Sequence, residues 1–320
     1  MIGAIDIGGT KIALGLVDAQ GYVLTSQKFP TAAYRESPTD GIAEIIARLR
    51  QCLDTAEGRM QGIGIGCTGP VDPRRGTLGK NAFLPGWQGV NLVQQLGEVF
   101  DVSVAIENDA NAATLGEWAW GAGRGADPFL LVSVGTGIGV GLVVNGRLYQ
   151  GVHGSHPEMG HHVIDPSGPA CFCGARGCWE SLASGQAMRN SSSERNWAQS
   201  HHPAGEANSV RQICALARQG DEFAIAVVKR AARYLAIGLA NLVTLFSPET
   251  ICLSGGLMQN SDLFWDEIER TVAASCGLVP HAEVKITLAA PGAQAGLVGA
   301  AQVWLSTFRQ STPAKGGFDA

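Results

Sequence analysis

The sequence predicts an α/β protein that is built as two lobes. Short apolar runs bounded by Gly or polar turns alternate with segments whose apolar residues recur every three or four positions, which indicates strands alternating with helices. A strand, a Gly-rich turn and a second strand also occur twice, around Gly8-Gly9 and around Gly135-Thr136-Gly137. This internal repeat suggests two similar lobes. The length of 320 residues leaves room for two domains of about 150 residues each.

The first part of the chain supplies the expected elements of one lobe. Ile42, Ile45 and Leu49 fall on one face of a helix, for which Thr39 or Asp40 is the expected cap. The other expected elements are strands at residues 2–7, 12–17, 23–29, 62–66 and 102–106, a helix capped by Asn91 that runs to Phe100, and a helix over residues 109–120.

The pattern starts again in the second part. Strands at residues 129–134 and 138–144 lead to a hairpin turn at Asn145-Gly146. After a Cys-rich loop we expect helices at about 206–218, 220–246 and 257–275, strands at 250–253 and 284–288, and a last helix at 293–305.

This order of elements predicts the domain boundaries. We expect a small lobe over residues 1–118 that is completed by the helix at about 293–306. A large lobe over residues 119–292 contains the Cys-rich loop at 160–180, and residues 307–320 form a flexible tail. A cleft between two such lobes is the expected ligand site.

Composition and charge argue against two classes of partner. Charged residues make up 16% of the chain and the net charge is −5, so we expect no nucleic-acid partner. The most apolar stretch, residues 129–144, carries four glycines and is shorter than the roughly 20 residues of a membrane helix. The first residues lack a basic and apolar leader, so we expect a cytoplasmic protein with no membrane association and with reduced thiols.

The Cys-rich loop predicts a metal site. His161, Cys171, Cys173 and Cys178 lie within 18 positions, on a loop that several glycines make pliable. One His and three Cys form a closed, four-coordinate structural zinc site in many proteins, and a Cys-x-Cys pair is a poor disulfide. The alternatives are unrelated thiols or an intracellular disulfide. The other cysteines occur in apolar contexts and are expected in the core: 52, 67, 214, 252 and 276.

Two Gly turns are candidates for binding a phosphate chain. Asp6 at a strand end is followed by Gly8, Gly9, Thr10 and Lys11, which offer backbone N–H groups and side-chain donors to phosphate oxygens. Asp6 is also a candidate to steer a hydrated Mg²⁺. A hairpin turn without a ligand is the alternative. The second turn consists of Gly135, Thr136 and Gly137. The G-x-G-x-x-G at residues 64–69 is no dinucleotide site, because prolines follow where a helix should begin.

Acidic residues supply candidates for catalysis and sugar binding. Asn108 and Asp109 follow a buried strand and open a helix. One interpretation is that they are N-cap residues. The alternative is that Asn108 binds a substrate hydroxyl and Asp109 acts as a general base. Glu158 and Glu180 flank the metal loop, and paired carboxylates suit a polyol. The remaining histidines are expected on the surface or in loops: 153, 156, 162, 201, 202 and 281.

Together these motifs resemble the ROK family (repressors, open reading frames and kinases), whose sugar kinases belong to the actin-like ATPase superfamily. The resemblance runs from Asp6 to about Ala300, nearly the whole chain. Its motifs are D-x-G-G-T-K at residues 6–11, T-G-P at 68–70, E-N-D-A-N at 107–111, G-T-G-x-G at 135–139, E-x-G-H at 158–161, C-x-C-G-x-x-G-C-x-E at 171–180 and G-G at 255–256.

The resemblance implies the fold and the reaction. It implies a two-lobed actin-like ATPase fold of the ribonuclease-H-like type, with a cleft between the lobes and a structural zinc loop. It also implies a homodimer that uses Mg²⁺ and ATP to phosphorylate a hexose hydroxyl, usually at C6. By position, Asp109 is the base and the zinc ligands are those above. Sugar contacts fall to Gly69, Asn108, Asp109, Glu158, His161 and Glu180, and nucleotide contacts fall to Asp6, the two Gly turns, Gly255 and Gly256.

Two departures from the family pattern concern the identity of the sugar. Phe83 stands where many family hexokinases have Asn before Leu-Pro-Gly-Trp, and Asn81 is displaced by two positions. His156-Pro157 resembles the fructokinase branch, whereas the Cys loop resembles glucokinases and N-acetylhexosamine kinases. We expect a glucokinase-like enzyme, with an N-acetylmannosamine or N-acetylglucosamine kinase or a fructokinase as alternatives. The alternatives from another class are regulators. A sugar-responsive transcription regulator of this family carries an N-terminal helix-turn-helix, and it is disfavoured because the phosphate motif begins at residue 6. A sugar-sensing regulator without a DNA-binding domain is disfavoured because Asp109 is retained beside both phosphate turns.

Overall fold

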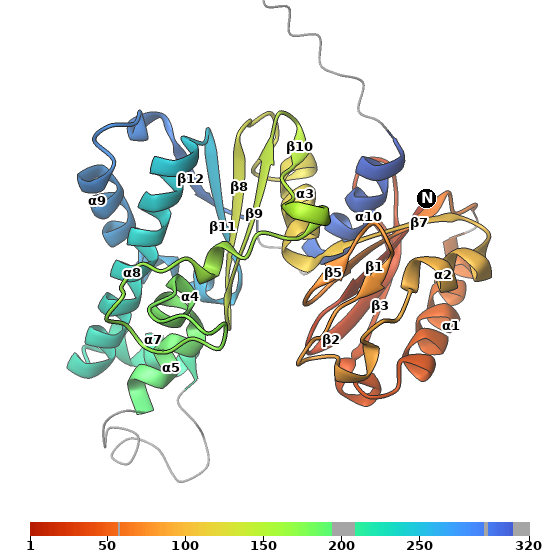
Figure 1. Cartoon of the computed structure of the whole chain (residues 1–320), viewed down its shortest axis with the longest axis horizontal. Helices are drawn as coiled ribbons and strands as arrows, with labels where there is room; N and C mark the ends of the chain where they lie inside the picture. Colours follow the sequence, from red (N-terminus) through yellow and green to blue (C-terminus); the bar gives the residue numbers. More distant parts are fainter. Residues whose placement is uncertain (57, 194–208, 291–293, 310–320) are drawn as a thin grey trace, which may run out of the picture. The chain divides into compact units, whose positions relative to one another are not determined.

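The structure, a computed structural model, describes residues 1–56, 58–193, 209–290 and 294–309. The chain divides into two compact units (Figure 1). Unit 1 comprises Met1–Gly121, Gln150–His156 and Pro291–Ala320, and unit 2 comprises Ala122–Tyr149 and Pro157–Ala290. Within the described ranges, no helix is long and apolar enough to cross a membrane.

Unit 1 contains a five-stranded sheet in the order β3-β2-β1-β4-β7. Strands β1 to β3 are antiparallel, whereas β4 and β7 continue the sheet parallel to β1. The strands are β1 (Ile2–Ile7), β2 (Lys11–Val17), β3 (Val23–Pro30), β4 (Gly62–Cys67) and β7 (Ser103–Asn108). The helices are α1 (Pro38–Ala56), α2 (Leu92–Phe100), α3 (Asp109–Trp120) and α10 (Ala295–Phe308), and a small hairpin is formed by β5 (Val71–Asp72) and β6 (Thr77–Leu78).

The sequence of β4 alternates Gly with larger residues, and this alternation lets α10 pack directly on the sheet. A Cβ atom at Gly62 would lie 2.0 Å from Trp304 Nε1, and one at Gly64 would lie 1.8 Å from Ala300 O. On the opposite face, Ile63 joins the apolar core that α1 and α2 cover. Because successive strand residues face opposite sides of the sheet, β4 presents only glycines to α10 and larger side chains to the opposite face.

Unit 2 contains a second five-stranded sheet, in the order β10-β9-β8-β11-β12. Its strands are β8 (Phe129–Val134), β9 (Ile138–Val144), β10 (Arg147–Leu148), β11 (Thr250–Ser254) and β12 (Lys285–Leu288). Its helices are α4 (Trp179–Ala183), α5 (Gly185–Ser193), α7 (Val210–Arg218), α8 (Glu222–Phe246) and α9 (Trp265–Ser275). Single 3₁₀ segments occur at Met159–His161, Gly256–Leu263 and His281–Glu283.

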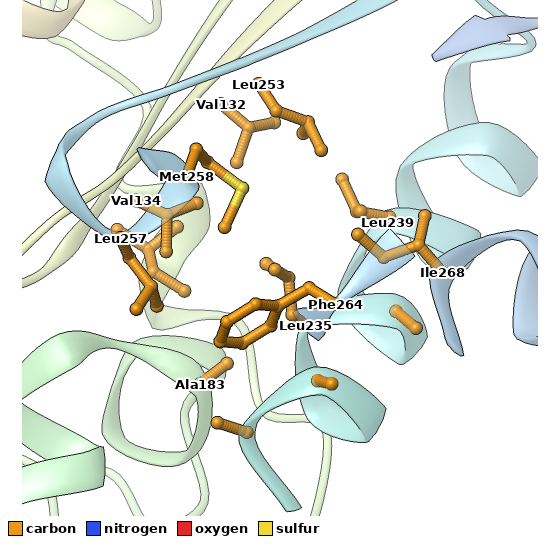
Figure 2. Close-up of a cluster of buried hydrophobic side chains, with 14 of the residues drawn as sticks. Val132, Val134, Ala183, Leu235, Leu239, Leu253, Leu257, Met258, Phe264 and Ile268 are labelled. Carbon is orange, nitrogen blue, oxygen red and sulfur yellow. The ribbon is translucent and has the colours of Figure 1, made fainter. Parts of the chain in front are cut away.

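The long helix α8 lies in the core of unit 2. Its residues Leu235 and Leu239 are fully buried together with Val132 and Leu253 of the sheet, and the ring of Phe264 fills the centre of the group (Figure 2). Burying a large apolar side chain contributes about 1.5–3 kcal/mol. Helix α8 therefore holds the sheet and the segments around the Cys loop in one packed body.

The two sheets repeat the same topology. In each, three antiparallel strands are followed by two further strands that are parallel to the first strand of the unit. The Gly turns predicted as the repeated feature join β1 to β2 and β8 to β9, which confirms the internal repeat. The hairpin turn expected at Asn145-Gly146 is also in place, since both residues have positive φ angles, 52° and 68°.

Several local predictions were wrong. Helix α1 begins at Pro38, so neither Thr39 nor Asp40 precedes it as a cap. The helix expected over residues 257–275 is a 3₁₀ segment, Gly256–Leu263, followed by α9. Helices α4 and α5 were not predicted, because the glycines and polar residues of this region suggested a loop. Residues 307–308 continue α10. Residues 310–320 of the expected tail, and residues 206–208 and 293 of two expected helices, lie outside the described residues.

Candidate active site

The parallel strands β1, β4 and β7 bring the candidate catalytic residues of unit 1 to one edge of the sheet. Asp6 is opposite Gly66 in the strand register, and Cys67 is opposite Asn108. Since parallel strands end at the same edge, the residues that follow them are neighbours as well. This places Asp109, the first residue of α3, at the same edge of the sheet as Asp6, with β4 between the two strands.

Asn108 takes the N-cap position, which was one of the two roles considered for this pair. Asn108 is the N-cap of α3, and its side-chain oxygen accepts hydrogen bonds from the backbone N–H groups of Ala110 and Asn111 at 2.9 and 3.3 Å. The Asp109 carboxylate accepts from Ala110 N at 2.9 Å. Burial raises the pKa of Asp109, and hydrogen bonds from Ala110 and Thr68 oppose the shift. Asp109 is therefore a stronger base than an exposed aspartate.

Asp6 lies close enough to Asp109 for the two charges to repel each other. Burial, and then the charge of Asp109, raise the pKa of Asp6 to about 6, and Lys11 opposes the shift. Burial and the charges of both carboxylates also raise the pKa of Cys67 well above its usual range. The second residue of α10 encloses Asp6, because a Cβ atom at Gly296 would lie 2.2 Å from Asp6 Oδ2.

Gly69 lies in a second polar group of unit 1. Its φ angle of 86° is in the left-handed region, and a Cβ atom there would lie 2.4 Å from Asn81 Nδ2. Asn81 is buried and donates from Nδ2 to Thr68 O at 2.6 Å, and Asn108 Nδ2 donates to Gly69 O at 3.2 Å. In the sequence, Asn81 is notable only because it is displaced by two positions from the family pattern. In the structure, its hydrogen bond to Thr68 O holds this turn in place.

The first Gly turn is a well-formed hairpin. Gly8 N donates to Lys11 O at 3.0 Å, and Thr31 donates from its hydroxyl to Gly8 O at 2.8 Å and from its backbone to Thr10 O at 3.1 Å. Thr10 and Lys11 are exposed. The turn therefore keeps its shape through its own hydrogen bonds and leaves the Thr10 and Lys11 side chains accessible.

The second Gly turn, in unit 2, is held by the helices that follow the Cys loop. Gly135 N donates to Gly137 O at 2.9 Å, and the carbonyl oxygens of Gly135 and Thr136 accept from the backbone of α5 at 2.8 and 3.2 Å. A Cβ atom at Gly137 would lie 2.2 Å from Glu180 Oε2, and one at Gly255 would lie 2.4 Å from Val134 O. These glycines are therefore required for close backbone approach.

Glu180 connects this turn to the Cys loop. Its Oε2 accepts from Ile138 N at 2.8 Å, and its Oε1 lies 3.9 Å from Nε2 of His161. On the other side of the ring, His161 Nδ1 lies 3.4 Å from Cys171 Sγ. Glu158 is exposed and directly precedes the 3₁₀ segment that carries His161.

The predicted metal ligands lie together. One ligand atom from each of His161, Cys171, Cys173 and Cys178 falls within 4.8 Å of every other, and the Cys173 and Cys178 sulfurs are 3.5 Å apart. The remaining cysteines are buried, as expected. The described residues thus contain a compact set of one imidazole and three thiols, which could hold a metal ion.

The other described histidines before residue 200 lie on the surface or in loops, as expected, but two of them are less exposed than a surface position would suggest. His153 is exposed, as expected, but His156 and His162 are partly buried and hydrogen-bonded, His156 to Asn111 and His162 to Met159 O. Burial lowers the pKa of His156 to about 4, so the ring is neutral at pH 7. His281 is partly buried as well and contacts Cys276 O. His201 and His202 lie outside the described residues.

The candidate site residues therefore form two groups, one in each unit. Unit 1 holds Asp6, the turn at residues 8–11, Gly69, Asn108 and Asp109. Unit 2 holds the turn at residues 135–137, the Cys loop, Glu158, Glu180 and the glycines at 255 and 256. Sequence reasoning missed the buried carboxylate of Glu107, which directly precedes Asn108. The signal was present, because a charged residue that ends a buried strand needs partners.

Comparisons with known proteins agree on the family. The sequence matches the profile of the ROK family over residues 2–307. It is 34% identical to the glucokinase of Streptomyces coelicolor over 313 residues, which cover 93% of this chain and 96% of that protein.

Solved structures give the same result. A ROK hexokinase from Thermus thermophilus is 34% identical with a TM-score of 0.84, covering 96% of this chain and 98% of that one. A ROK family glucokinase from Streptomyces griseus, in complex with glucose and AMPPNP, is 33% identical with a TM-score of 0.74, covering 94% and 98%. The chain therefore belongs to the ROK family, and its repeated α/β units have the actin-like ATPase fold.

The raised pKa of Asp6 predicts how stability depends on pH. The folded state favours the protonated carboxyl, so the contribution of Asp6 to stability is full below its unfolded pKa of 3.8 and is lost as the pH rises through about 6. Asp6→Asn should therefore raise the free energy of unfolding at pH 8, by up to about 3 kcal/mol. The gain should vanish below pH ~4.

Urea unfolding at pH 8 and at pH 4 measures this difference. Asp54→Asn, at an exposed position of α1, is the matched control and should change stability little at either pH. An Asp6→Asn variant that is less stable than the wild type at pH 8 would contradict the conclusion that the ionised Asp6 carboxylate destabilises the folded protein.

Proposed function

We propose that this chain is an ATP-dependent, glucokinase-like sugar kinase that transfers the γ-phosphate to a hexose hydroxyl, at C6. The observation that carries the proposal is the enclosed pair of carboxylates, Asp6 and Asp109, at the carboxyl ends of parallel strands beside the Gly turn at residues 8–11. The similarity to glucokinases, one of them solved with glucose and a nucleotide analogue, supports it.

Asp109 is the proposed general base. As an ionised carboxylate with a raised pKa, it accepts the proton of the attacking sugar hydroxyl. The N-cap of α3 fixes its backbone, and the hydrogen bond from Ala110 N fixes one of its oxygens. The proposed sugar contacts are those of Gly69, Asn108, Glu158, His161 and Glu180.

The nucleotide is proposed to contact both Gly turns. Backbone N–H groups of residues 8–11 and 135–137 suit phosphate oxygens, and Gly255 and Gly256 suit the adenosine, because glycines let a ligand approach the backbone. Asp6 is the proposed partner of a hydrated Mg²⁺, because Mg²⁺ usually keeps several of its waters and binds through one or two carboxylates. Bound Mg²⁺ supplies charge neutralisation of the phosphates in phosphoryl transfer.

The Cys loop is proposed to hold a structural zinc ion. The chemistry of the donor set fits, because one imidazole and three thiols complete a tetrahedron with Zn–S bonds of about 2.3 Å, and the ligand atoms already lie within 4.8 Å of one another. With Nδ1 of His161 facing the thiols, its Nε2 faces Glu180. Zinc would therefore fix the ring that offers Nε2 to the sugar.

Other aspects of the function stay predictions. An N-acetylhexosamine or fructose substrate is the alternative within the kinase class, since Phe83 and His156-Pro157 depart from the family pattern. The homodimer, the cytoplasmic location and the lobe boundaries at residues 118 and 292 also stay predictions.

Removing the base tests the reaction. Asp109→Asn should lower the rate of ADP release with Mg·ATP and glucose by about 10²–10⁴-fold, since amide oxygens cannot take up the proton. Glucose affinity, measured by calorimetry, should stay within a few-fold, because the amide keeps a hydrogen-bonding oxygen. The assay should include fructose, mannose, N-acetylglucosamine and N-acetylmannosamine as alternative acceptors.

Asp101→Asn is the matched control, because Asp101 is exposed in the same unit and its left-handed conformation, with φ of 52°, suits Asn equally well. Unchanged turnover in Asp109→Asn would remove Asp109 from its role. Sugar binding without ADP release in the wild type, for every sugar tried, would favour a sugar sensor over a kinase.

Removing one metal ligand tests the zinc site. Cys173→Ser should lose the bound zinc, lower the melting temperature and raise the KM for sugar by about tenfold, since a misplaced ring of His161 weakens binding. Cys214→Ser, a buried position of α7 in the same unit, should lose stability but keep one zinc per chain. Purified wild type without zinc by elemental analysis would end the proposal.

A further inference from the structure

Glu107 is the centre of a buried hydrogen-bond network beside the candidate base. The side chain is 4% exposed, and its Oε1 accepts from Asn108 N at 2.8 Å and from Asn111 Nδ2 at 3.0 Å. Its Oε2 accepts from Nε2 of Gln150. Asn111 is fully buried, and its Oδ1 lies 2.8 Å from Nδ1 of His156.

In this network each hydrogen bond is donated toward Glu107: His156 donates to Asn111, and Asn111, Asn108 and Gln150 donate to Glu107. Asn111 uses its amide nitrogen toward Glu107, so its oxygen must face His156 as an acceptor. His156 therefore carries its proton on Nδ1, in agreement with a neutral ring. Three donors converge on Glu107, and hydrogen bonds of this kind favour the ionised carboxylate. The hydrogen bonds oppose the rise in the pKa of Glu107 that burial causes.

Two of the partners come from a distant segment, Gln150–His156, which we call the strap. The strap closes on itself through hydrogen bonds from Gly151 N to Ser155 O at 2.8 Å and from Gly154 N to Gly151 O at 3.1 Å. Only its two end residues, Gln150 and His156, reach the network at the start of α3. The strap packs with unit 1, whereas the residues on both sides of it in sequence, Tyr149 and Pro157, belong to unit 2.

We propose that Gln150 and His156 are positioning residues, which clamp the strap onto the first turn of α3 and thereby set the place of Glu158, two residues after His156. The proposal rests on the proposed function, because Glu158 is there a sugar contact and Asp109 the base. Glu107 orients the backbone of Asn108 with one oxygen and holds Gln150 with the other. One carboxylate thus joins the segment of the base to the strap, whose last residue is followed after Pro157 by Glu158.

A buried network of this kind has a further consequence for specificity. His156 is the residue by which this chain departs from the family pattern before Glu158, and its Nδ1–H is the only hydrogen bond that the structure gives it among the described residues. The departure therefore changes how the strap is anchored, and it reaches the sugar through the position of Glu158 without a direct contact being needed.

Gln150→Glu tests the clamp without disturbing the core, because Gln150 is exposed. Two carboxylates would then face each other, and the strap should lose its hold on Glu107. We expect the KM for the sugar to rise about tenfold, with the KM for ATP within about twofold. Gln88→Glu, an exposed position of unit 1, is the matched control and should leave both constants unchanged.

Rescue separates positioning from a general loss of stability. The double variant Glu107→Gln/Gln150→Glu exchanges the amide and the carboxylate. The amide nitrogen at position 107 then donates to the carboxylate at position 150, while the amide oxygen still accepts from Asn108 N and Asn111 Nδ2. The sugar KM of the double variant should return to within about threefold of the wild type. A sugar KM that Gln150→Glu leaves unchanged, or that the double variant does not restore, would overturn the proposal.

Hydrogen exchange keeps the test independent of activity. Amides of residues 151–156 and 158 should exchange faster in Gln150→Glu and return to the wild-type rate in the double variant. Equal rates in all three proteins would contradict the clamp. If the wild type is active and the sugar KM of Gln150→Glu is unchanged, the clamp is refuted but the proposed function is not. A wild type that releases no ADP with any sugar refutes the proposed function, and the exchange rates still decide whether the clamp exists.

Discussion

The closeness of two carboxylates, Asp6 and Asp109, is the constraint on which the rest of unit 1 depends. Burial, and then the charge of Asp109, raise the pKa of Asp6, so enclosing both carboxylates in ionised form is unfavourable. Parallel pairing of β1, β4 and β7 fixes both residues at one edge of the sheet, and α10 closes over Asp6 with no side chain at Gly296 to interfere. The fold therefore stabilises an arrangement that the two charges alone would oppose, which is common at functional sites.

The repeated fold carries different chemistry in its two units. Both sheets begin with a Gly hairpin, yet unit 1 adds enclosed acids and unit 2 adds the Cys loop. In unit 2, Glu180 contacts the second Gly turn through Ile138 N and faces His161 on its other side. The Glu180 side chain thus lies between the second Gly turn and the ring of His161. The family relationship accounts for the shared architecture, and the local hydrogen bonds account for the division of roles.

The spacing of apolar residues and the positions of turn and capping residues predicted most of the fold. The strands of both sheets other than β10, and the helix from Asp109 to Trp120, were found because apolar alternation and capping residues mark them locally. The short helices α4 and α5 were missed because distant backbone groups hold their first residues: Trp179 N of α4 donates to His162 O, and Gly185 N and Gln186 N of α5 donate to the carbonyl oxygens of residues 135 and 136. The Cys cluster was predicted from its spacing alone. The network of Glu107 was not, since Gln150 and His156 reach it from a distant segment that no local pattern identifies.

The titration of Asp6 tests the central claim most directly. In ligand-free protein, carboxyl ¹³C NMR should give Asp6 a pKa of about 6. In Asp109→Asn the pKa should fall, because one repelling charge is gone, yet stay above 3.8, because burial is the larger cause. A pKa near 3.8 in the wild type, or one that Asp109→Asn does not change, would show that the two carboxylates are not enclosed together.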